Sequence, residues 1–478
     1  MTDVEAFPSA LQTLPEAARA AALEALEKEF ARAPGEAPPL PEAERDLGHA
    51  YVLAGLFKGR YIWAKHMGKW LEYDSGAWRP VHDERVEYAA AEALRREYAR
   101  LLDAETDRER IKELTKRIND ACVAARVYGA LRFLRGMTGF YAESFDQDPW
   151  LLNCRNGTLN LFTMQLQPHN PDDLLTKQAP VDYDPDADCP GWQAHLERCI
   201  PSPAVRRQIA RDLGLSLVGA ALDEILPVWW GDGKNGKTTT TRVLMGVLGD
   251  YAGRAAPNLL IASKYERHPT ELADLAGKRL VISIETGEGK RLNEALVKEL
   301  TGGDTLKGRF MRQDFFSFPK TFTIFLITNH KPVIRGVDSG IWRRIRLVPW
   351  TVEIPPDVRR PQDEVVAELL TEGPGILNWL LDGFLDWFAS RDWVAPEVQA
   401  ATEAYRAEQD VLGAFIAEAC ELGDRHSVPV AELYEAYVAW CGQAGEEALG
   451  KAAFGRILRQ RGIDQERTMT ERKWRGIR

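Results

Sequence analysis

The stretch that decides the fold is Trp229-Trp230-Gly231-Asp232-Gly233-Lys234-Asn235-Gly236-Lys237-Thr238-Thr239. It matches G-x-x-x-x-G-K-[ST], the spacing of a phosphate-binding loop. Glycines let backbone N–H groups curl around a phosphate without Cβ clashes. Lys237 can reach the β- and γ-phosphates of a nucleoside triphosphate, and Thr238 can place its hydroxyl on Mg²⁺. The stretch therefore predicts a site for ATP and Mg²⁺.

The flanking sequence favours this prediction over a chance match. Residues 225–230 are typical of a short buried strand, and residues 239–248 have the apolar spacing of a helix. Strand, loop and helix is the order that places a helix N-terminus at the phosphate. The residues expected to bind the nucleotide are Gly231, Gly233, Asn235, Gly236, Lys237, Thr238 and Thr239.

The composition is that of a globular chain of 478 residues, enough for about three domains. No apolar run approaches the roughly 20 residues that cross a bilayer, and the acidic N-terminus lacks an apolar signal segment. We therefore expect a cytoplasmic protein with no membrane partner. The six cysteines form no C-x-x-C pair and no zinc-like cluster with histidine. The net charge of −10 argues against a surface coated for nucleic acid, although a basic surface can still be local.

Apolar runs alternate with helical patterns between about residue 206 and residue 350. Strand candidates at 279–285, 323–329 and 344–349, with the loop at the end of another strand, predict an α/β fold with a parallel sheet. Five units are expected: an N-terminal helix and linker (1–45), a mixed α+β domain (46–200), the nucleotide-binding core (201–355), a helical connector (356–410) and a C-terminal domain (411–478).

Finer expectations concern the α+β unit. Short strands are expected near 60–63 and 69–78, around a turn at Ser75-Gly76. A charged helical stretch is expected from residue 84 to about 128. Residues 145–183 are expected to be rich in loops, because Asn156-Gly157 and the run His169-Asn170-Pro171 are turn signals.

Two polar residues end predicted strands. Glu285 is a candidate Mg²⁺ ligand and activator of the attacking water, expected beside the phosphate loop; a surface acid at a strand end is the alternative. Glu288 follows three residues later. Asn329 ends another strand, where an amide can hydrogen-bond a γ-phosphate or polarise a water, although Asn is also frequent at turns.

Two basic clusters follow the loop. Arg343, Arg344 and Arg346 suit charge that develops on a transferred phosphoryl group, and at least one of them is expected to be an ordinary surface arginine. In residues 306–320, cations alternate with aromatic rings, as single-strand binding requires. We expect most of these rings to lie in a core and some of the cations to contact the DNA backbone.

The C-terminal residues 451–478 carry nine Lys/Arg and three Asp/Glu in an otherwise acidic chain. Residues 428–434 and 454–458 are interpreted as two helices, and residues 473–477 as a β-wing. This order is typical of a winged helix that binds DNA, with Lys473 and Arg475 as candidate contacts. A basic surface that binds nothing is the alternative.

The order of these motifs resembles superfamily 3 helicases, and more narrowly the poxvirus-type and phage/plasmid primase-helicase family. The resemblance is carried by the phosphate loop, the Glu285 strand, Gly302-Gly303-Asp304, the basic hairpin, residues 328–332 and residues 342–345. Residues 148–159 also resemble the domain that precedes the ATPase in that family. The resemblance implies an AAA+-type core in a ring, usually a hexamer, that hydrolyses ATP and moves 3′ to 5′ along single-stranded DNA.

The resemblance also implies roles for individual residues. It makes Lys237 and Thr238 the phosphate and Mg²⁺ ligands, Glu285 the strand-end acid and Asn329 the sensor, and either Arg343 or Arg344 the finger that reaches a neighbour's ATP. The hairpin cations that would face DNA in the pore are Lys307, Arg309 and Arg312. One departure is Thr286, which stands where many members have a second acid.

These inferences lead to one function and two alternatives. We expect an ATP-dependent DNA helicase of a phage, plasmid or other mobile element, forming a homo-oligomeric ring on single-stranded and forked DNA. The segment before residue 46 is too short for a primase domain, so a separate primase or polymerase is expected as a partner. The alternatives are a DNA-bound ATPase switch or defence protein that does not unwind, and a structural DNA-binding ring with vestigial nucleotide binding.

Overall fold

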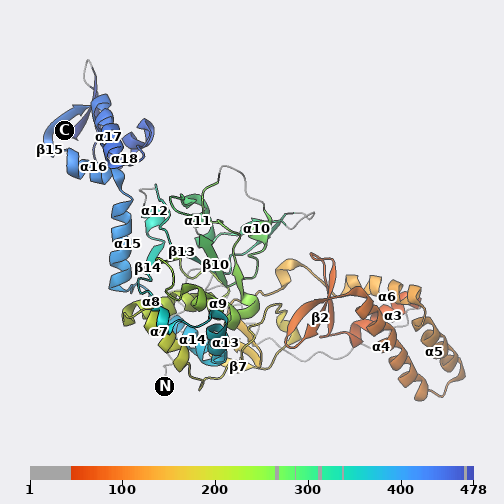
Figure 1. The fold of residues 1–478 in the computed structure, drawn as a ribbon. Coiled ribbons are helices and arrows are strands. Elements are labelled where there is room, and N and C mark those ends of the chain that lie inside the picture. Colours follow the sequence, from red (N-terminus) through yellow and green to blue (C-terminus); the bar gives the residue numbers. More distant parts are fainter. Residues whose placement is uncertain (1–44, 264–268, 286, 310–314, 336–338, 468–470) are drawn as a thin grey trace.

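Five parallel strands form the central sheet of the computed structural model, in the spatial order β14-β8-β13-β10-β9; Figure 1 labels β14, β13 and β10. They are β8 (Leu226–Trp230), β9 (Ala252–Arg254), β10 (Leu280–Glu285), β13 (Thr323–Thr328) and β14 (Ile345–Pro349). The predicted parallel α/β sheet is therefore confirmed. The structure describes residues 45–263, 269–285, 287–309, 315–335, 339–467 and 471–478. The expected N-terminal helix and linker thus lie outside the described residues.

Both faces of this sheet are buried, which is why its strands are apolar almost throughout. On one face, Trp229, Ile282 and Phe325 share a core with four neighbouring helices. These are α8 (Pro203–Gly214), α9 (Lys237–Leu248), α13 (Gln362–Leu370) and α14 (Gly373–Ala389). On the other face, Val228 and Leu326 pack in a second core. Its helices include α11 (Glu294–Thr301), α12 (Ser339–Trp342) and α15 (Pro396–Glu408).

The N-terminal part of the described chain has a hydrophobic core of its own. It contains α3 (Arg45–Leu56), α4 (Asp83–Asp103), α5 (Arg108–Ala121) and α6 (Ala124–Met137), beside a small sheet in the order β3-β2-β1-β4. The strands are β1 (Tyr61–Ala64), β2 (Lys69–Asp74), β3 (Ala77–Val81) and β4 (Gly139–Phe140). The expected turn joins β2 to β3, with Ser75 and Gly76 at φ of 50° and 88°.

Residues 145–183 are mostly loops and turns, as expected, and they also contain short strands. They hold an antiparallel sheet of β5 (Leu151–Cys154), β6 (Gly157–Asn160) and β7 (Gln165–Gln167), followed by α7 (Pro190–Cys199). Trp150 and Leu159 lie in the same core as Trp229 of the central sheet. This packing favours a boundary between the α+β domain and the nucleotide-binding core near residue 145 rather than near residue 200. The division of the chain into five units stays a proposal.

The C-terminal part lies at the far end of α15 from the central sheet, drawn in blue in Figure 1. It contains α16 (Val411–Ala419), β15 (Leu422–Pro429), α17 (Val430–Ala444), α18 (Lys451–Gln460), β16 (Gln465–Arg467) and β17 (Arg472–Ile477). The expectation of a helix over 428–434 was wrong at its start, because β15 runs to Pro429 and pairs with β17. Among the described residues, no helix is both long and apolar enough to cross a membrane.

Candidate functional site

The glycine-rich loop connects the end of β8 to the start of α9, in the order that the sequence predicted. Gly233 and Gly236 have φ of 98° and 87°, a backbone region that other residues rarely adopt. A Cβ on Gly231 would lie 2.0 Å from the carbonyl oxygen of Trp350. The loop therefore needs glycine at each of these three positions, two for conformation and one for space.

The ammonium group of Lys237 is held inside this loop. It donates to the carbonyl oxygen of Gly231 at 2.7 Å and to Oδ1 of Asn235 at 3.2 Å. Burial lowers the pKa of Lys237 to about 8, although the nearby Asp232 carboxylate acts in the opposite direction. Two uncharged oxygens are weak compensation for a buried cation, so an anion at this point would be strongly favoured.

Asn235 fixes the loop from the other side. Its Nδ2 donates to the carbonyl oxygen of Trp350 at 2.8 Å, which ties the loop to the chain just after β14. Thr238 is exposed in the first turn of α9. Thr239 accepts a hydrogen bond from Nε2 of Gln362 at 3.2 Å. The loop is thus held by hydrogen bonds at Asn235 and Lys237 and exposed at Thr238.

Helix α7 packs against the loop and the start of α9, a contact that the sequence did not indicate. A Cβ on Gly236 would come within 2.3 Å of Sγ of Cys199. Nε2 of His195 lies 2.9 Å from Oγ1 of Thr240, in the first turns of α9. Burial lowers the pKa of His195 to about 4 and keeps the ring neutral at pH 7. No motif marks these residues, because they contact the loop through tertiary packing alone.

Three strand ends lie in one row across the sheet. Glu285 pairs with Thr328 of β13, and Thr328 pairs with Trp230 of β8. Glu285 is therefore two strands away from the loop, not on the adjacent strand, because β13 inserts between β10 and β8. The side chain of Glu285 is buried, and its Oε1 accepts a hydrogen bond from Ser283 at 2.9 Å.

Asn329 follows β13 and is exposed, one residue beyond that row. Because β13 adjoins β8, Asn329 follows the strand that is next to the loop. The N–H of Gly231, in the loop, donates to the carbonyl oxygen of Thr328 at 3.4 Å. Glu288 is exposed. Thr286, the position of the missing second acid, lies outside the described residues.

Arg343 and Arg344 lie at the amino ends of the sheet strands, whereas the glycine-rich loop follows the carboxyl end of β8. Arg344 directly precedes β14, and its carbonyl oxygen accepts a hydrogen bond from the N–H of Leu226, the first residue of β8. At about 3.3 Å per residue, β8 separates its two ends by roughly 13 Å. Arg343 and Arg344 are therefore not brought together with Lys237 within one copy of the chain.

The three arginines differ in their surroundings. Arg344 is buried and donates to Oγ1 of Thr301 at 2.9 Å and to the carbonyl oxygen of Gly340 at 2.6 Å. Arg346 is largely buried between Asp212, at 2.7 Å, and Asp223, at 3.0 Å. Arg343 is the exposed member, with 64% of its side chain accessible.

The basic hairpin is present as β11 (Leu306–Gly308) and β12 (Phe316–Phe318). Lys307 is exposed, and the guanidinium of Arg309 lies 4.7 Å from the ring centre of Phe315. Phe318 is buried in the second core and Phe316 packs against it partly buried, whereas Phe315 is exposed, so the expectation of core rings holds for only some of the described ones. Arg312, which lies between β11 and β12 in the sequence, is outside the described residues.

The predicted C-terminal DNA contacts, Lys473 and Arg475, are the sequence neighbours of a buried tryptophan. Trp474 is fully buried in β17, between the half-buried Lys473 and the exposed Arg475. Lys473 forms an ion pair with Glu471 at 2.9 Å. Helix α18 adds exposed arginines at 456 and 459, which were not among the expected DNA contacts although they share the polar face of an amphipathic helix.

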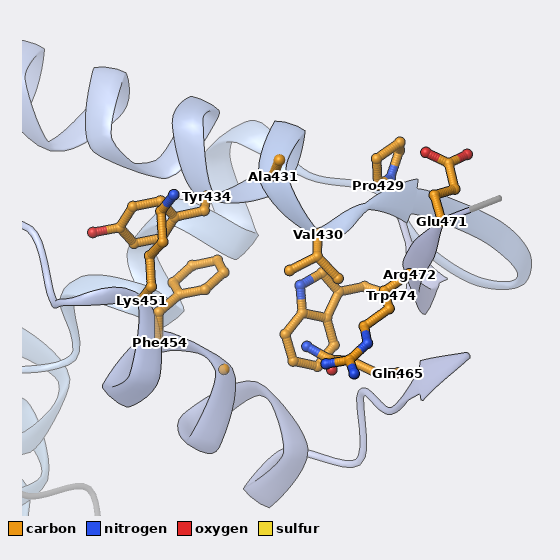
Figure 2. Close-up of a pocket in the computed structure, with 11 residues that line it drawn as sticks. Pro429, Val430, Ala431, Tyr434, Lys451, Phe454, Gln465, Glu471, Arg472 and Trp474 are labelled. Carbon is orange, nitrogen blue, oxygen red and sulfur yellow. The ribbon is translucent and has the colours of Figure 1, made fainter. Parts of the chain in front are cut away.

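A pocket of about 340 Å³ opens between α17, α18 and β17. Figure 2 shows the rings of Tyr434 and Phe454 on one side of it and the indole of Trp474 on the other, with Lys451 and Arg472 among the lining residues.

Comparisons with known proteins agree with this arrangement of parts. Residues 50–201 match the family model described as D5 N terminal like, and residues 407–472 match the one described as Poxvirus D5 protein-like. The intervening residues 229–344 match a family of unknown function, DUF5906. The chain belongs to the D5-type primase-helicase family. The expectation drawn from the motif order is thereby confirmed at the level of the family.

Curated relatives of this D5-type chain come from large DNA viruses. The chain is 27% identical over 306 residues to "Putative helicase L207/L206" of Acanthamoeba polyphaga mimivirus, covering 59% of this chain and 32% of that protein. It is 25% identical over 324 residues to "Putative helicase 022R" of Frog virus 3, covering 63% and 31%. It is 25% identical over 329 residues to "Putative primase C962R" of African swine fever virus, covering 63% and 34%. The chain thus spans about a third of the length of these relatives.

Among solved structures, the C-terminal region of NrS-1 (residues 305–718) in its A form shares the fold of the D5-type chain. The TM-score is 0.50 at 10% identity, over 91% of this chain and all of that one. This likeness concerns the fold alone.

Proposed function

We propose that this D5-type chain is an ATP-dependent DNA helicase that forms a ring and translocates along single-stranded DNA in the replication of a phage, plasmid or other mobile element. The observation that carries the proposal is the row from Trp230 through Thr328 to Glu285, which sets the glycine-rich loop, Asn329 and a buried acid at one sheet edge. Its family membership supports DNA replication as the setting. The 3′ to 5′ polarity comes from the resemblance to superfamily 3.

In the proposed site, the loop is a P-loop of an AAA+-type core and binds ATP. Lys237 would exchange its two neutral acceptors for phosphate oxygens, a gain that its burial favours. Thr238 and Glu285 would hold Mg²⁺ together with phosphate oxygens, because Mg²⁺ in such sites is bound by one or two protein side chains and by the phosphates of the substrate. Glu285 would also activate the attacking water, and Asn329 would orient it.

The position of the arginines supports an oligomer. Because Arg343 and Arg344 lie at the edge opposite to the loop, either could contact a nucleotide only on another copy of the chain. Head-to-tail contacts of this kind close into rings when the rotation permits, and the resemblance implies a hexamer. Arg343 is the favoured finger, since Arg344 is buried and bonded to its own chain.

The DNA contacts are proposed at two places. In a ring, one hairpin per copy would bring Lys307, Arg309 and Arg312 into a central pore around single-stranded DNA. The C-terminal elements follow in the order helix, strand, two helices and a two-stranded hairpin, which supports a winged helix. Lys473 and Arg475, with the arginines of α18, would contact forked or double-stranded DNA there.

A forked substrate tests the proposal. The purified chain with ATP and Mg²⁺ should displace the strand of a fork with a free 3′ tail and leave a fork with only a 5′ tail intact. The Lys237→Ala variant should displace neither. DNA-stimulated ATP hydrolysis without displacement would favour the alternative of an ATPase switch, and absence of hydrolysis would favour a structural DNA-binding ring.

A further inference from the structure

Arg343 and Arg344 share one acceptor, Oε2 of Glu224. The two hydrogen bonds measure 2.7 and 2.6 Å. Glu224 lies in the loop directly before β8, and about half of its side chain (46%) is accessible to solvent. The exposed arginine is therefore paired with an acid of its own chain at the sheet edge that faces away from the loop.

The two arginines are held unequally. Besides its bond to Glu224, Arg344 donates hydrogen bonds to Thr301 and to the carbonyl oxygen of Gly340. Among the described residues, the side chain of Arg343 has no hydrogen bond other than the one to Glu224. Exposed ion pairs of this kind are weak and exchange readily, whereas a buried guanidinium with several acceptors does not. Arg343 can therefore leave Glu224 while Arg344 stays in place.

We infer that Glu224 is the resting counter-ion of Arg343, and that it competes for this arginine with the triphosphate bound to a second copy of the chain. The inference rests on the proposed function, because it requires a nucleotide at the neighbour's loop. When Arg343 transfers to a phosphate, Glu224 stays bonded to Arg344, so no charge is left without a partner. Glu224 is a positioning residue that restrains the finger until a neighbouring nucleotide draws it away.

The base of the hairpin keeps Arg344 in place. Thr301, at the end of α11, accepts from Nε of Arg344 through its hydroxyl and from Nζ of Lys320 through its carbonyl oxygen, at 2.9 and 3.1 Å. Lys320 is buried and follows β12 by two residues. The fixed arginine is thereby anchored to the hairpin that is proposed to face DNA, and only Arg343 is free to move.

The test is the Glu224→Gln variant, which keeps a hydrogen-bond acceptor for both arginines but removes the competing charge. ATP hydrolysis without DNA should rise about two- to fivefold in kcat/KM, because an exposed charge pair contributes at most modestly. Glu368→Gln is the matched control, since Glu368 forms an exposed ion pair with Arg360 at 2.7 Å. It should hydrolyse ATP at the parental rate.

A double variant separates restraint of the finger from a structural effect. In an Arg343→Ala background, the Glu224→Gln change should leave the low residual rate of hydrolysis unchanged, since the finger that it would free is gone. The inference is overturned if Glu224→Gln matches Glu368→Gln, or if its effect persists without Arg343. If Lys237→Ala and Arg343→Ala both hydrolyse ATP at the parental rate, the proposed function itself fails and the inference falls with it.

Discussion

Lys237 turns its ammonium group back to the carbonyl oxygen of Gly231, the first residue of the loop that leads to it, at 2.7 Å. This contact holds the lysine at the center of the loop before any anion is bound. The low pKa of the buried ammonium, about 8, follows from the same enclosure. The relationship has a measurable consequence for nucleotide binding.

The affinity for ATP should depend on pH above about 8. Free Lys237 loses its proton near that pH, whereas a bound triphosphate stabilises the charged form and raises its pKa. Binding then takes up a proton, and affinity should fall by up to about tenfold per pH unit as pH rises above 8. Calorimetry at pH 7 and pH 9, in buffers of different ionisation enthalpy, measures both the affinity and the proton uptake.

The same lysine affects stability with a defined sign. Its pKa is near 8 in the folded chain and near 10.5 in the unfolded chain, so the unfolded chain binds more protons between these values. Its contribution to the free energy of unfolding should therefore rise with pH from about 8 to 10.5 and stay flat below 8. A Lys237→Ala variant should lose this contribution. The difference in the free energy of unfolding between parent and variant, measured by urea titration, should therefore rise between pH 8 and pH 10.5. A difference that stays constant over this range would contradict the assignment.

Two substitutions separate nucleotide binding from turnover. Lys237→Ala should reduce ATP hydrolysis by at least about 100-fold, because it removes the cation on the β- and γ-phosphates. Glu285→Gln should retain nucleotide binding but lose hydrolysis to a similar extent, because the amide cannot activate water. A phosphate-release assay with a fluorescent nucleotide titration checks both, and near-parental hydrolysis by both variants would refute the site.

Arg343 and Arg344 should differ in stability and in trans complementation. Arg344→Ala should lower the free energy of unfolding by about 1–3 kcal/mol, because it leaves buried acceptors without a donor. Arg343→Ala should change it by less than about 0.5 kcal/mol. Arg343→Ala copies alone should hydrolyse ATP only at a low residual rate. Mixed one to one with Lys237→Ala copies, they should regain hydrolysis, since about a quarter of random head-to-tail interfaces then join an intact arginine to an intact loop. A monomer with full activity in light scattering would exclude the composite site.

The hairpin should couple DNA to hydrolysis. Lys307→Ala with Arg312→Ala should reduce unwinding and the stimulation of ATP hydrolysis by single-stranded DNA, with hydrolysis in the absence of DNA largely kept. Affinity for single-stranded DNA should lose about 0.7 in its logarithmic salt slope per phosphate contact removed. Lys116→Ala, an exposed lysine on α5, serves as the control. Parental unwinding by the double variant would move the main DNA site to the C-terminal part.

The C-terminal cations should act on forked or duplex DNA. Replacing Arg456 and Arg475 with alanine should weaken duplex binding roughly tenfold or more at physiological salt, because each removed phosphate contact costs affinity. Both side chains are exposed, so the melting temperature should stay close to that of the parent. Fluorescence anisotropy with duplex and single-stranded oligonucleotides distinguishes this effect from that of the hairpin. Equal loss on both substrates would argue against a duplex site.

The sequence predicted those parts of the site that depend on local pattern. The loop, the apolar strand before Glu285 and the strand before Asn329 are each contained in a short run of residues. The insertion of β13 between β8 and β10 could not be read in this way, because strand order depends on pairing between distant segments. The same holds for His195 and Cys199 under the loop, which contact it only after α7 has packed against α9.

Physical reasons also explain why some strands were not expected from the sequence. β5 to β7 are only three or four residues each and are broken by turn signals, so their composition is that of a loop. β15 contains Gly423, Asp424 and Pro429, which are rare in strands, and its pairing with β17 supplies what propensity does not.

The opposite placement of loop and arginines gives each copy of the chain a receiving edge and a donating edge. In the proposed assembly, any open row of copies has one loop at its end that no arginine completes and one arginine that no loop receives. Only closure of the row removes both defects at once. An open assembly would thus differ from a closed one in its rate of hydrolysis per copy, because the nucleotide site at one end of the row lacks an arginine.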